Sequence, residues 1–344
     1  MQTHDTMGLK RRIPGLLFGL WSAACAAQPM DRTELVKVSP SVLKIEAVGT
    51  SGRFQLGSGV VVAEGKVVTN CHVTRAAARV HVVKGGVRWP ATAQSADPLR
   101  DLCLLRVPRI QDDVAPIVRT DSLRLGQPVM AIGYTGGATL QLSEGAVVAL
   151  HEWGGSKIIQ SSNWFSSGAS GGGLFTAEGA LVGILTFRLR GGALHYYAAP
   201  ADWLLGRLDD ERRYVPIAPL QARAYWEDRS DQQPYFLQAA ALEQGRQWQP
   251  LASLAEAWAA QSAQDPEPAY LLGVAYDGLG RTEESIEALR RCLALEPRFS
   301  RSLVKLAHIY KQQGRPDDVR TALHSLAALD PERARELSNE LETP

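Results

Sequence analysis

The sequence has no excess of charge of either sign, few cysteines and little that could enter a membrane. Its 344 residues include 37 Lys and Arg against 36 Asp and Glu, so it lacks the basic footprint of a nucleic-acid or lipid-surface protein. Its four cysteines form no Cys-x-x-Cys pair and no His/Cys spacing that suits zinc, so we expect no metal site. The chain is long enough for two or three domains.

The N-terminus has the layout of an export signal. Residues 10–12 are basic, residues 13–24 are mostly apolar, and an Ala-Cys-Ala cleavage frame follows. The apolar run is well short of the ~20 residues that span a bilayer, so we predict a signal peptide over residues 1–26 and no membrane span. A lipoprotein anchored through Cys25 is the alternative. It is disfavoured because Ser22 lies where a large aliphatic residue is usual.

Short apolar runs, separated by Gly, Pro, Asp or Lys-Gly-Gly breaks, fill residues 36–200. No helical pattern comes between them, so a sheet with crossover helices is disfavoured and two sets of about six strands predict paired antiparallel barrels. A helical stretch from Ala201 to Arg212 is expected to close this domain, which we place at residues 35–212. The predicted strands are Val42–Ala47, Gly57–Ala63, Val67–Thr69, Val80–Val83, Leu102–Val107, Val129–Gly133, Thr139–Leu150, Lys157–Gln160, Leu181–Phe187 and Ala193–Ala198.

The C-terminal part of the chain is helical and repetitive. Residues 213–232 show no clear period and are expected to be a linker, whereas residues 233–344 are rich in Ala, Leu, Glu, Gln and Arg at helical spacing. Within them Gly280 recurs as Gly314, a period of 34 residues. This period, with Gly between helices and Pro after the second helix, resembles the tetratricopeptide repeat.

The best copies of this repeat are residues 266–299 and 300–333, and a degenerate copy precedes them. Each unit is a helical hairpin that needs neighbours to bury its apolar face. Tyr276 and Tyr310 are interpreted as packing residues, and Cys292 as a buried thiol. We expect an all-α binding module whose concave face holds a protein partner.

One serine lies in a glycine-rich segment, residues 166–175. Glycines there allow sharp turns, so Ser170 could act as a nucleophile with the N–H groups of Gly168 and Ser170 facing an oxyanion. A flexible Gly/Ser loop is the alternative. Upstream, His72 lies at the end of one apolar strand and Asp101 at the head of another. The order His, Asp, Ser is that of chymotrypsin-type proteases.

These fragments together resemble the HtrA/Deg-type trypsin-like serine proteases over roughly residues 35–212. The resemblance implies that Ser170 is the nucleophile, His72 the general base and Asp101 the orienting acid, with an oxyanion hole at Gly168 and Ser170 and no cofactor. The motifs that carry it are Gly57-Ser58-Gly59-Val60, Thr69-Asn70-Cys71-His72-Val73, Asp101-Leu102-Cys103-Leu104-Leu105, Leu125 to Gly133, Ile158-Ile159-Gln160, Gly168-Ala169-Ser170-Gly171-Gly172, Val182-Gly183-Ile184 and Ala199-Pro200.

The sequence departs from this family at three places. Ala169 stands where the family usually has Asn, and Gly173 where it usually has Pro. Helical repeats replace the family's C-terminal PDZ domains. The resemblance selects neither an oligomeric state nor a physiological substrate.

The sequence leaves open which residues select the substrate. Leu185, Thr186 and Phe187 are placed to pair with a substrate backbone as an added strand. Trp164 and Phe165 either line the primary pocket, which would favour small or medium apolar side chains, or belong to the core.

Because His72 and Asp101 must approach each other, their neighbours Cys71 and Cys103 should also be close. In an oxidising compartment they would form a disulfide; two buried free thiols are the alternative.

Two hypotheses follow for the whole chain. The first is a periplasmic or secreted serine endopeptidase that hydrolyses polypeptides, misfolded proteins among them, through an acyl-enzyme, while its repeats recruit substrates or partners. The second keeps the protease fold without the activity, as a silent or latent binding or chaperone-like module. The presence of all three triad residue types favours the first.

Overall fold

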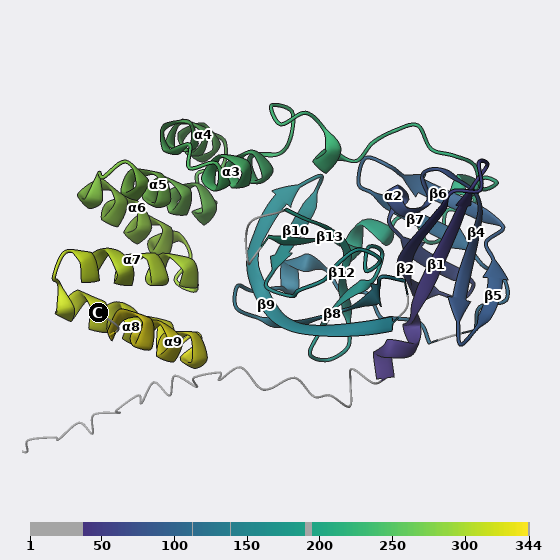
Figure 1. Ribbon diagram of the computed structural model, residues 1–344, viewed down its shortest axis with the longest axis horizontal. Helices are drawn as coiled ribbons and strands as arrows, with labels where there is room; N and C mark the ends of the chain where they lie inside the picture. The colour runs from purple at the N-terminus through teal and green to yellow at the C-terminus, as the bar shows by residue number, and fades with distance from the viewer. Residues whose placement is uncertain (1–36, 112, 138, 190–194, 343–344) are drawn as a thin grey trace, which may run out of the picture.

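The computed structural model describes residues 37–111, 113–137, 139–189 and 195–342. The predicted signal peptide over residues 1–26, with Cys25, lies outside the described residues. Figure 1 shows two neighbouring β units followed by a row of helices at the C-terminal end of the chain. None of the helices within these ranges is long and apolar enough to cross a membrane.

The first β unit is an antiparallel sheet in which seven strands follow the order β5-β4-β1-β2-β3-β7-β6. Its alternating Val, Ile and Leu side chains bury one face completely, with Leu43, Ile45, Val61, Val67 and Leu105 at 0% exposure. The strands are β1 (Val42–Gly49), β2 (Phe54–Ala63), β3 (Lys66–Thr69), β4 (Ala77–Lys84), β5 (Val87–Pro90), β6 (Ala93–Asp97) and β7 (Leu102–Arg106).

The second β unit is a closed barrel with the order β10-β13-β12-β11-β8-β9. The long strand β9 bends around it in Figure 1. Closure leaves the barrel without free edges, and its interior is filled by side chains such as Ile159, Leu174 and Val182. The strands are β8 (Pro128–Thr135), β9 (Thr139–Trp153), β10 (Ser156–Ser161), β11 (Gly173–Thr176), β12 (Leu181–Arg188) and β13 (Tyr196–Pro200).

A shared apolar layer joins the two β units. Val68 and Leu104 of the first unit belong to the same buried cluster as Ile132 and Ile184 of the second. Backbone hydrogen bonds also cross between the segments, from Cys71 after β3 to Asp101 after β6, and from Ser58 of β2 to Ser170 after β10. The double-barrel fold expected from the short apolar runs is observed.

The structure corrects two details of the sequence prediction. The helix expected over Ala201–Arg212 is wrong: a 3-10 turn, Ala201–Leu204, is followed by turns and a second 3-10 turn, Glu211–Arg213. Trp203 and Leu204 are buried against the β domain. The segment therefore lies along the surface of that domain and does not form a separate helix. Strands β5, β6 and β11 had no predicted counterpart because they are short and poor in alternating apolar residues.

The C-terminal region is a stack of antiparallel helices. The helix pairs α5/α6 and α7/α8 fall within the two predicted copies, and Gly280 and Gly314 lie between the helices of each pair with φ of +74° and +64°, a conformation that favours glycine. Tyr310 is buried and Tyr276 partly buried. The helices are α3 (Tyr235–Gln244), α4 (Trp248–Gln261), α5 (Pro266–Gly278), α6 (Thr282–Leu295), α7 (Ser300–Gln312), α8 (Pro316–Ala327) and α9 (Pro331–Glu342).

The helical stack docks on the second barrel. His151 of β9 is buried and stacks on Phe236 of α3 with ring centroids 4.4 Å apart. Farther along, the Nε–H of Arg298 donates to the carbonyl oxygen of Leu125 at 3.1 Å. A cleft of about 590 Å³ is lined by residues of both parts, Leu125 and Arg298 among them.

Candidate active site

His72 projects from a short helical turn, α2 (Cys71–Thr74), that directly follows strand β3. Asn70 precedes this turn and its side-chain Nδ2–H donates to the carbonyl oxygen of Asp101 at 3.0 Å. The main chain of Cys71 donates to the same oxygen at 3.2 Å. These two bonds tie the turn that carries His72 to the loop that carries Asp101.

Asp101 lies between β6 and β7 in a left-handed conformation, with φ of +58°. Its side chain is completely buried, whereas 18% of the His72 side chain is exposed. The Oδ1 atom accepts the backbone N–H of His72 at 2.8 Å, and Oδ2 lies 2.6 Å from His72 Nδ1. A buried carboxylate needs such donors, and together they fix both the position and the plane of the imidazole.

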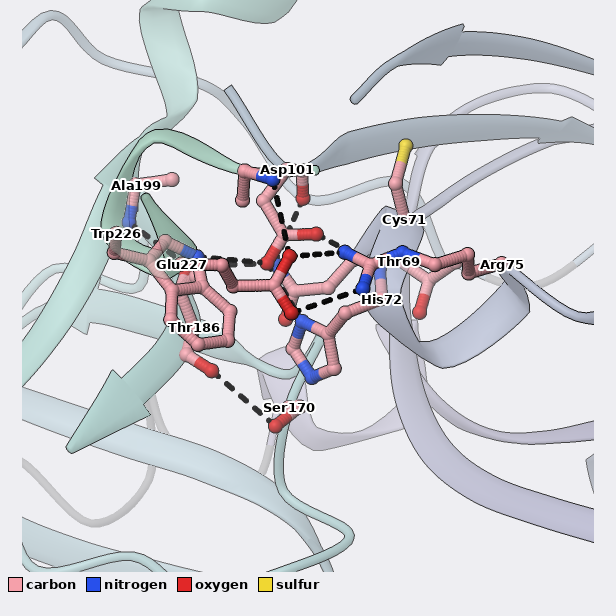
Figure 2. A network of polar contacts seen from close by, with 12 residues as sticks. Thr69, Cys71, His72, Arg75, Asp101, Ser170, Thr186, Ala199, Trp226 and Glu227 are labelled. Carbon is pink, nitrogen blue, oxygen red and sulfur yellow. Dashed lines mark hydrogen bonds and ion pairs between the residues drawn. The ribbon is translucent and has the colours of Figure 1, made fainter. Parts of the chain in front are cut away.

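Ser170 lies on the loop between β10 and β11, and the first β unit supports that loop. The backbone N–H of Ser58 donates to the carbonyl oxygen of Ser170 at 2.8 Å, and its Oγ–H donates to the carbonyl oxygen of Gly168 at 2.8 Å. Figure 2 shows the His72 ring between Asp101 and Ser170. The Ser170 hydroxyl donates to the carbonyl oxygen of Thr186 at 3.3 Å.

The backbone conformation of this loop requires a glycine at position 168. Its φ is +97°, and a Cβ there would lie 2.6 Å from the carbonyl oxygen of Tyr134. Within the described ranges the backbone N–H groups of Gly168 and Ser170 donate to no protein acceptor, so both remain available for a ligand oxygen. The backbone of this turn thus has a defined geometry that glycine favours at position 168.

The two loop positions that depart from the HtrA/Deg pattern have local explanations. Ala169 is buried and packs against Gly133, where a Cβ would lie 3.1 Å from the Ala169 side chain. A Cβ on Gly173 would collide with the ring of Phe175. Phe175 therefore occupies the space that a larger residue at position 173 would need.

Phe165 and Trp164, both predicted as possible pocket residues, differ in their exposure. Phe165 is 5% exposed and packs edge-on against Tyr196 in the second-barrel core, whereas Trp164 is 48% exposed. The core alternative thus describes Phe165. Trp164 remains at the surface beside the loop.

Strand β12 is less open to an added strand than expected. The N–H of Leu185 donates to Gly172 and its carbonyl oxygen accepts from Gly171, both at 2.8 Å. Thr186 and Phe187 are also buried. The backbone of Leu185 is thus already paired within the protein, and Thr186 contacts Ser170 through its carbonyl oxygen.

Cys71 and Cys103 form a disulfide with a sequence separation of 32 residues. Cys71 precedes His72, and Cys103 follows Asp101 by two residues. The bridge therefore links the two segments that hold the His72–Asp101 pair. Cys292 is a free, buried cysteine in α6.

Two residues of the linker that the sequence did not indicate also reach this site. Trp226 donates its Nε1–H to Asp101 Oδ2 at 3.2 Å, and Glu227 pairs with Arg75, which directly follows α2. No local signal marks this contact, because 125 residues separate Trp226 from Asp101. Across the described ranges, no cluster of His, Cys, Asp or Glu side chains could hold a metal ion.

The structure places His72, Asp101 and Ser170 at one site on two β units that are joined to helical repeats. Residues 57–184 match the family of trypsin-like peptidase domains, and residues 278–339 match the tetratricopeptide repeat. The chain thus contains a region that matches trypsin-like peptidase domains, followed by a region that matches tetratricopeptide repeats.

Individual relatives agree with this assignment. The chain is 30% identical over 207 residues to serine protease HTRA4 of Mus musculus, covering 54% of this chain and 42% of that protein. It is 34% identical over 151 residues to the periplasmic serine endoprotease DegP of Salmonella typhimurium, covering 40% and 32%. The match therefore spans less than half the length of these relatives.

A solved structure supports the fold alone. The Rv3671c protease from M. tuberculosis, in its active form, is 20% identical and covers 64% of this chain and 99% of that chain, with a TM-score of 0.50.

Proposed function

We propose that this protein is an exported serine endopeptidase that hydrolyses polypeptides through an acyl-enzyme. The observation that carries the proposal is the position of the His72 ring between Asp101 and Ser170 in Figure 2, with Nδ1 of the ring 2.6 Å from Oδ2 of the buried Asp101 carboxylate. Relatedness to serine proteases of the HtrA type supports the same chemistry.

In the proposed reaction, Ser170 Oγ attacks a peptide carbonyl carbon while His72 Nε2 takes its proton. Asp101 holds the ring and stabilises the imidazolium, and the N–H groups of Gly168 and Ser170 donate to the oxyanion. The C–N bond then breaks, and the leaving amine receives the proton from His72. Water, activated by His72, hydrolyses the ester that remains on Ser170.

Export is supported by two further observations. The disulfide between Cys71 and Cys103 suits an oxidising compartment, and DegP relatives are named as periplasmic. We place the mature protein in the periplasm or outside the cell.

The repeats would hold a protein partner or a segment of the substrate on their concave face. Hydrogen exchange of full-length Ser170→Ala protein with and without casein tests this role, because the variant cannot release its substrate by cleavage. Slower exchange in α5–α8 is expected with casein present; unchanged exchange there would contradict recruitment by the repeats.

The activity itself is tested by digestion of casein. The native protein should degrade it, and Ser170→Ala should lower turnover by around 10⁶-fold, as removal of the nucleophile does in intact triads. Ser325→Ala, on the exposed side of α8, is the matched control and should behave like the native protein. Cleavage by Ser170→Ala at the native rate would contradict the assignment. A native protein that binds casein without cleaving it would support the alternative, a silent or latent binding module.

A further inference from the structure

The linker between the two domains is packed on the protease domain. Val215 exchanges two backbone hydrogen bonds with Gln94 of β6, at 2.8 and 2.9 Å. Farther on, the N–H of Tyr225 donates to the carbonyl oxygen of Leu99 at 3.1 Å, and Tyr225 is 2% exposed. In Figure 1 the linker passes over the top of the β units before it enters α3. The segment after Tyr225 is therefore held close to Asp101.

Trp226 touches both members of the His–Asp pair. Its Nε1–H donates to Asp101 Oδ2 at 3.2 Å, and its ring stands edge-on to the His72 ring with centroids 5.5 Å apart. The Trp226 ring also stacks on that of Phe187 of β12, with centroids 5.0 Å apart. Figure 2 shows Trp226 beside Asp101 and His72. Three contacts thus determine where the indole N–H points.

The hydroxyl group of Thr186 does not donate a second hydrogen bond to the Asp101 carboxylate beside the one from Trp226. Thr186 Oγ1–H donates to the carbonyl oxygen of Ile184 at 2.7 Å, and Thr186 Oγ1 accepts the backbone N–H of Ala199 at 3.2 Å. Apart from the two bonds from His72, the donor that reaches the Asp101 carboxylate within the described residues is therefore Trp226.

An ion pair beside Trp226 fastens the linker to the turn that carries His72. Glu227 Oε1 accepts from Arg75 Nη1 at 2.9 Å, its Oε2 pairs with Arg75 Nη2, and Oε2 also accepts the N–H of Ala224 at 3.0 Å. Burial alone would raise the pKa of Glu227, but the hydrogen bonds from Arg75 and Ala224 lower it below its usual value. The carboxylate is thus charged, and the paired geometry with Arg75 is directional.

We propose that Trp226 is a positioning residue of the active site, held in place by the ion pair between Glu227 and Arg75. Its N–H balances the charge of Asp101 and fixes the carboxylate plane, so that the carboxylate in turn orients His72 toward Ser170. Its ring covers the His–Asp pair from water. This inference rests on the proposed function, and it makes the linker part of the active site.

The test compares Trp226→Phe with the native protein on fluorescein-labelled casein. Phenylalanine keeps a ring to stack on Phe187 but has no N–H. Because one hydrogen bond to a charged group is lost, kcat should fall about tenfold or more, while KM stays within twofold. The rate of fluorophosphonate labelling should fall in parallel. Trp89→Phe, the same change on β5, is the matched control and should leave both constants unchanged.

A second variant keeps the inference testable if Trp226→Phe does not fold. Glu227→Gln keeps the side-chain shape and the acceptor for Ala224 but weakens the pairing with Arg75. It should lower kcat in the same direction by a smaller factor, with a thermal unfolding midpoint close to that of the native protein.

Three results would overturn the inference. Unchanged kcat in both variants would show that Asp101 and His72 do not depend on the linker. A raised KM with unchanged kcat would make Trp226 a wall of the substrate site instead. A folded native protein without activity would refute the proposed function, and the inference with it.

Discussion

Asp101 holds His72 through both of its carboxylate oxygens, one on the backbone N–H at 2.8 Å and the other 2.6 Å from Nδ1 of the ring. The first bond fixes the turn and the second fixes the ring. Because the carboxylate is fully buried, neither bond competes with water. The orientation of the imidazole therefore depends on the charge and acceptor capacity of one side chain.

Asp101→Asn should leave the fold intact but remove most of the activity. The amide has nearly the same shape, but it replaces one acceptor by a donor and so favours the wrong tautomer of His72. We expect kcat to fall by about 10⁴-fold, as this change does in a chymotrypsin-type triad. Steady-state kinetics on casein measure it, with circular dichroism to verify folding. Activity within tenfold of the native protein would show that Asp101 does not orient the base.

Gly168→Ala should damage the site without replacing any side chain that carries chemistry. The φ of +97° is unfavourable for alanine, and its Cβ would press against the backbone of Tyr134. The N–H of residue 168 must then move, and loss of one oxyanion donor costs about 10²- to 10³-fold in kcat. Gly206→Ala is the matched control, because a Cβ there meets no atom within 4 Å. Equal kcat for both variants would exclude an oxyanion hole at this position.

Removal of the disulfide should lower the stability of the fold. Closing a loop of 32 residues stabilises by roughly 3–4 kcal/mol in the chain-entropy model. The free energy of unfolding in urea should fall by about that amount in the Cys71→Ala/Cys103→Ala double variant. The change Cys292→Ala, at a buried cysteine without a bridge, separates loss of a sulfur from loss of the bond.

Peptide mapping without reductant tests the bridge directly. It should recover Cys71 and Cys103 in one linked pair, and Cys292 alone should be alkylated after denaturation. Alkylation of all three would contradict the pairing.

Asp265 at the barrel–repeat cleft should make stability fall as the pH rises. Burial raises the pKa of Asp265 to about 7, whereas an unfolded chain releases this proton near pH 4. The folded state therefore binds the extra proton between these values, and its advantage is lost as the pH rises toward 7. Asp265→Asn, which is neutral throughout and can still accept the N–H of Glu267, should raise the thermal midpoint more at pH 8 than at pH 5.

The control for that measurement is Asp317→Asn on the exposed surface of α8, where the shift should be the same at both pH values. An equal shift at the two pH values for Asp265→Asn as well would contradict a buried, protonated Asp265.

The sequence could indicate His72, Asp101 and Ser170 because each lies in a short motif whose neighbours determine the local conformation. Gly168 is an example: the loop turns at a φ that favours glycine, and glycine is visible in the sequence. The double-barrel fold and the repeats could be predicted for a similar reason, since strand alternation and the 34-residue period are local patterns.

What the sequence could not indicate depends on long-range packing. Trp226 lies in a segment without a period, and its meaning comes only from the proximity of Asp101, 125 residues away. The expected helix over residues 201–212 failed because burial of Trp203 against the β domain outweighed a weak helical pattern.

The proposed activity depends on Ser170 as the reactive group. The direct measurement is mass-spectrometric mapping of the folded, full-length protein after reaction with a fluorophosphonate. We expect a single adduct on Ser170, present in the native protein and absent from the His72→Ala variant. An adduct on another residue, or equal labelling of Ser170 without His72, would contradict it.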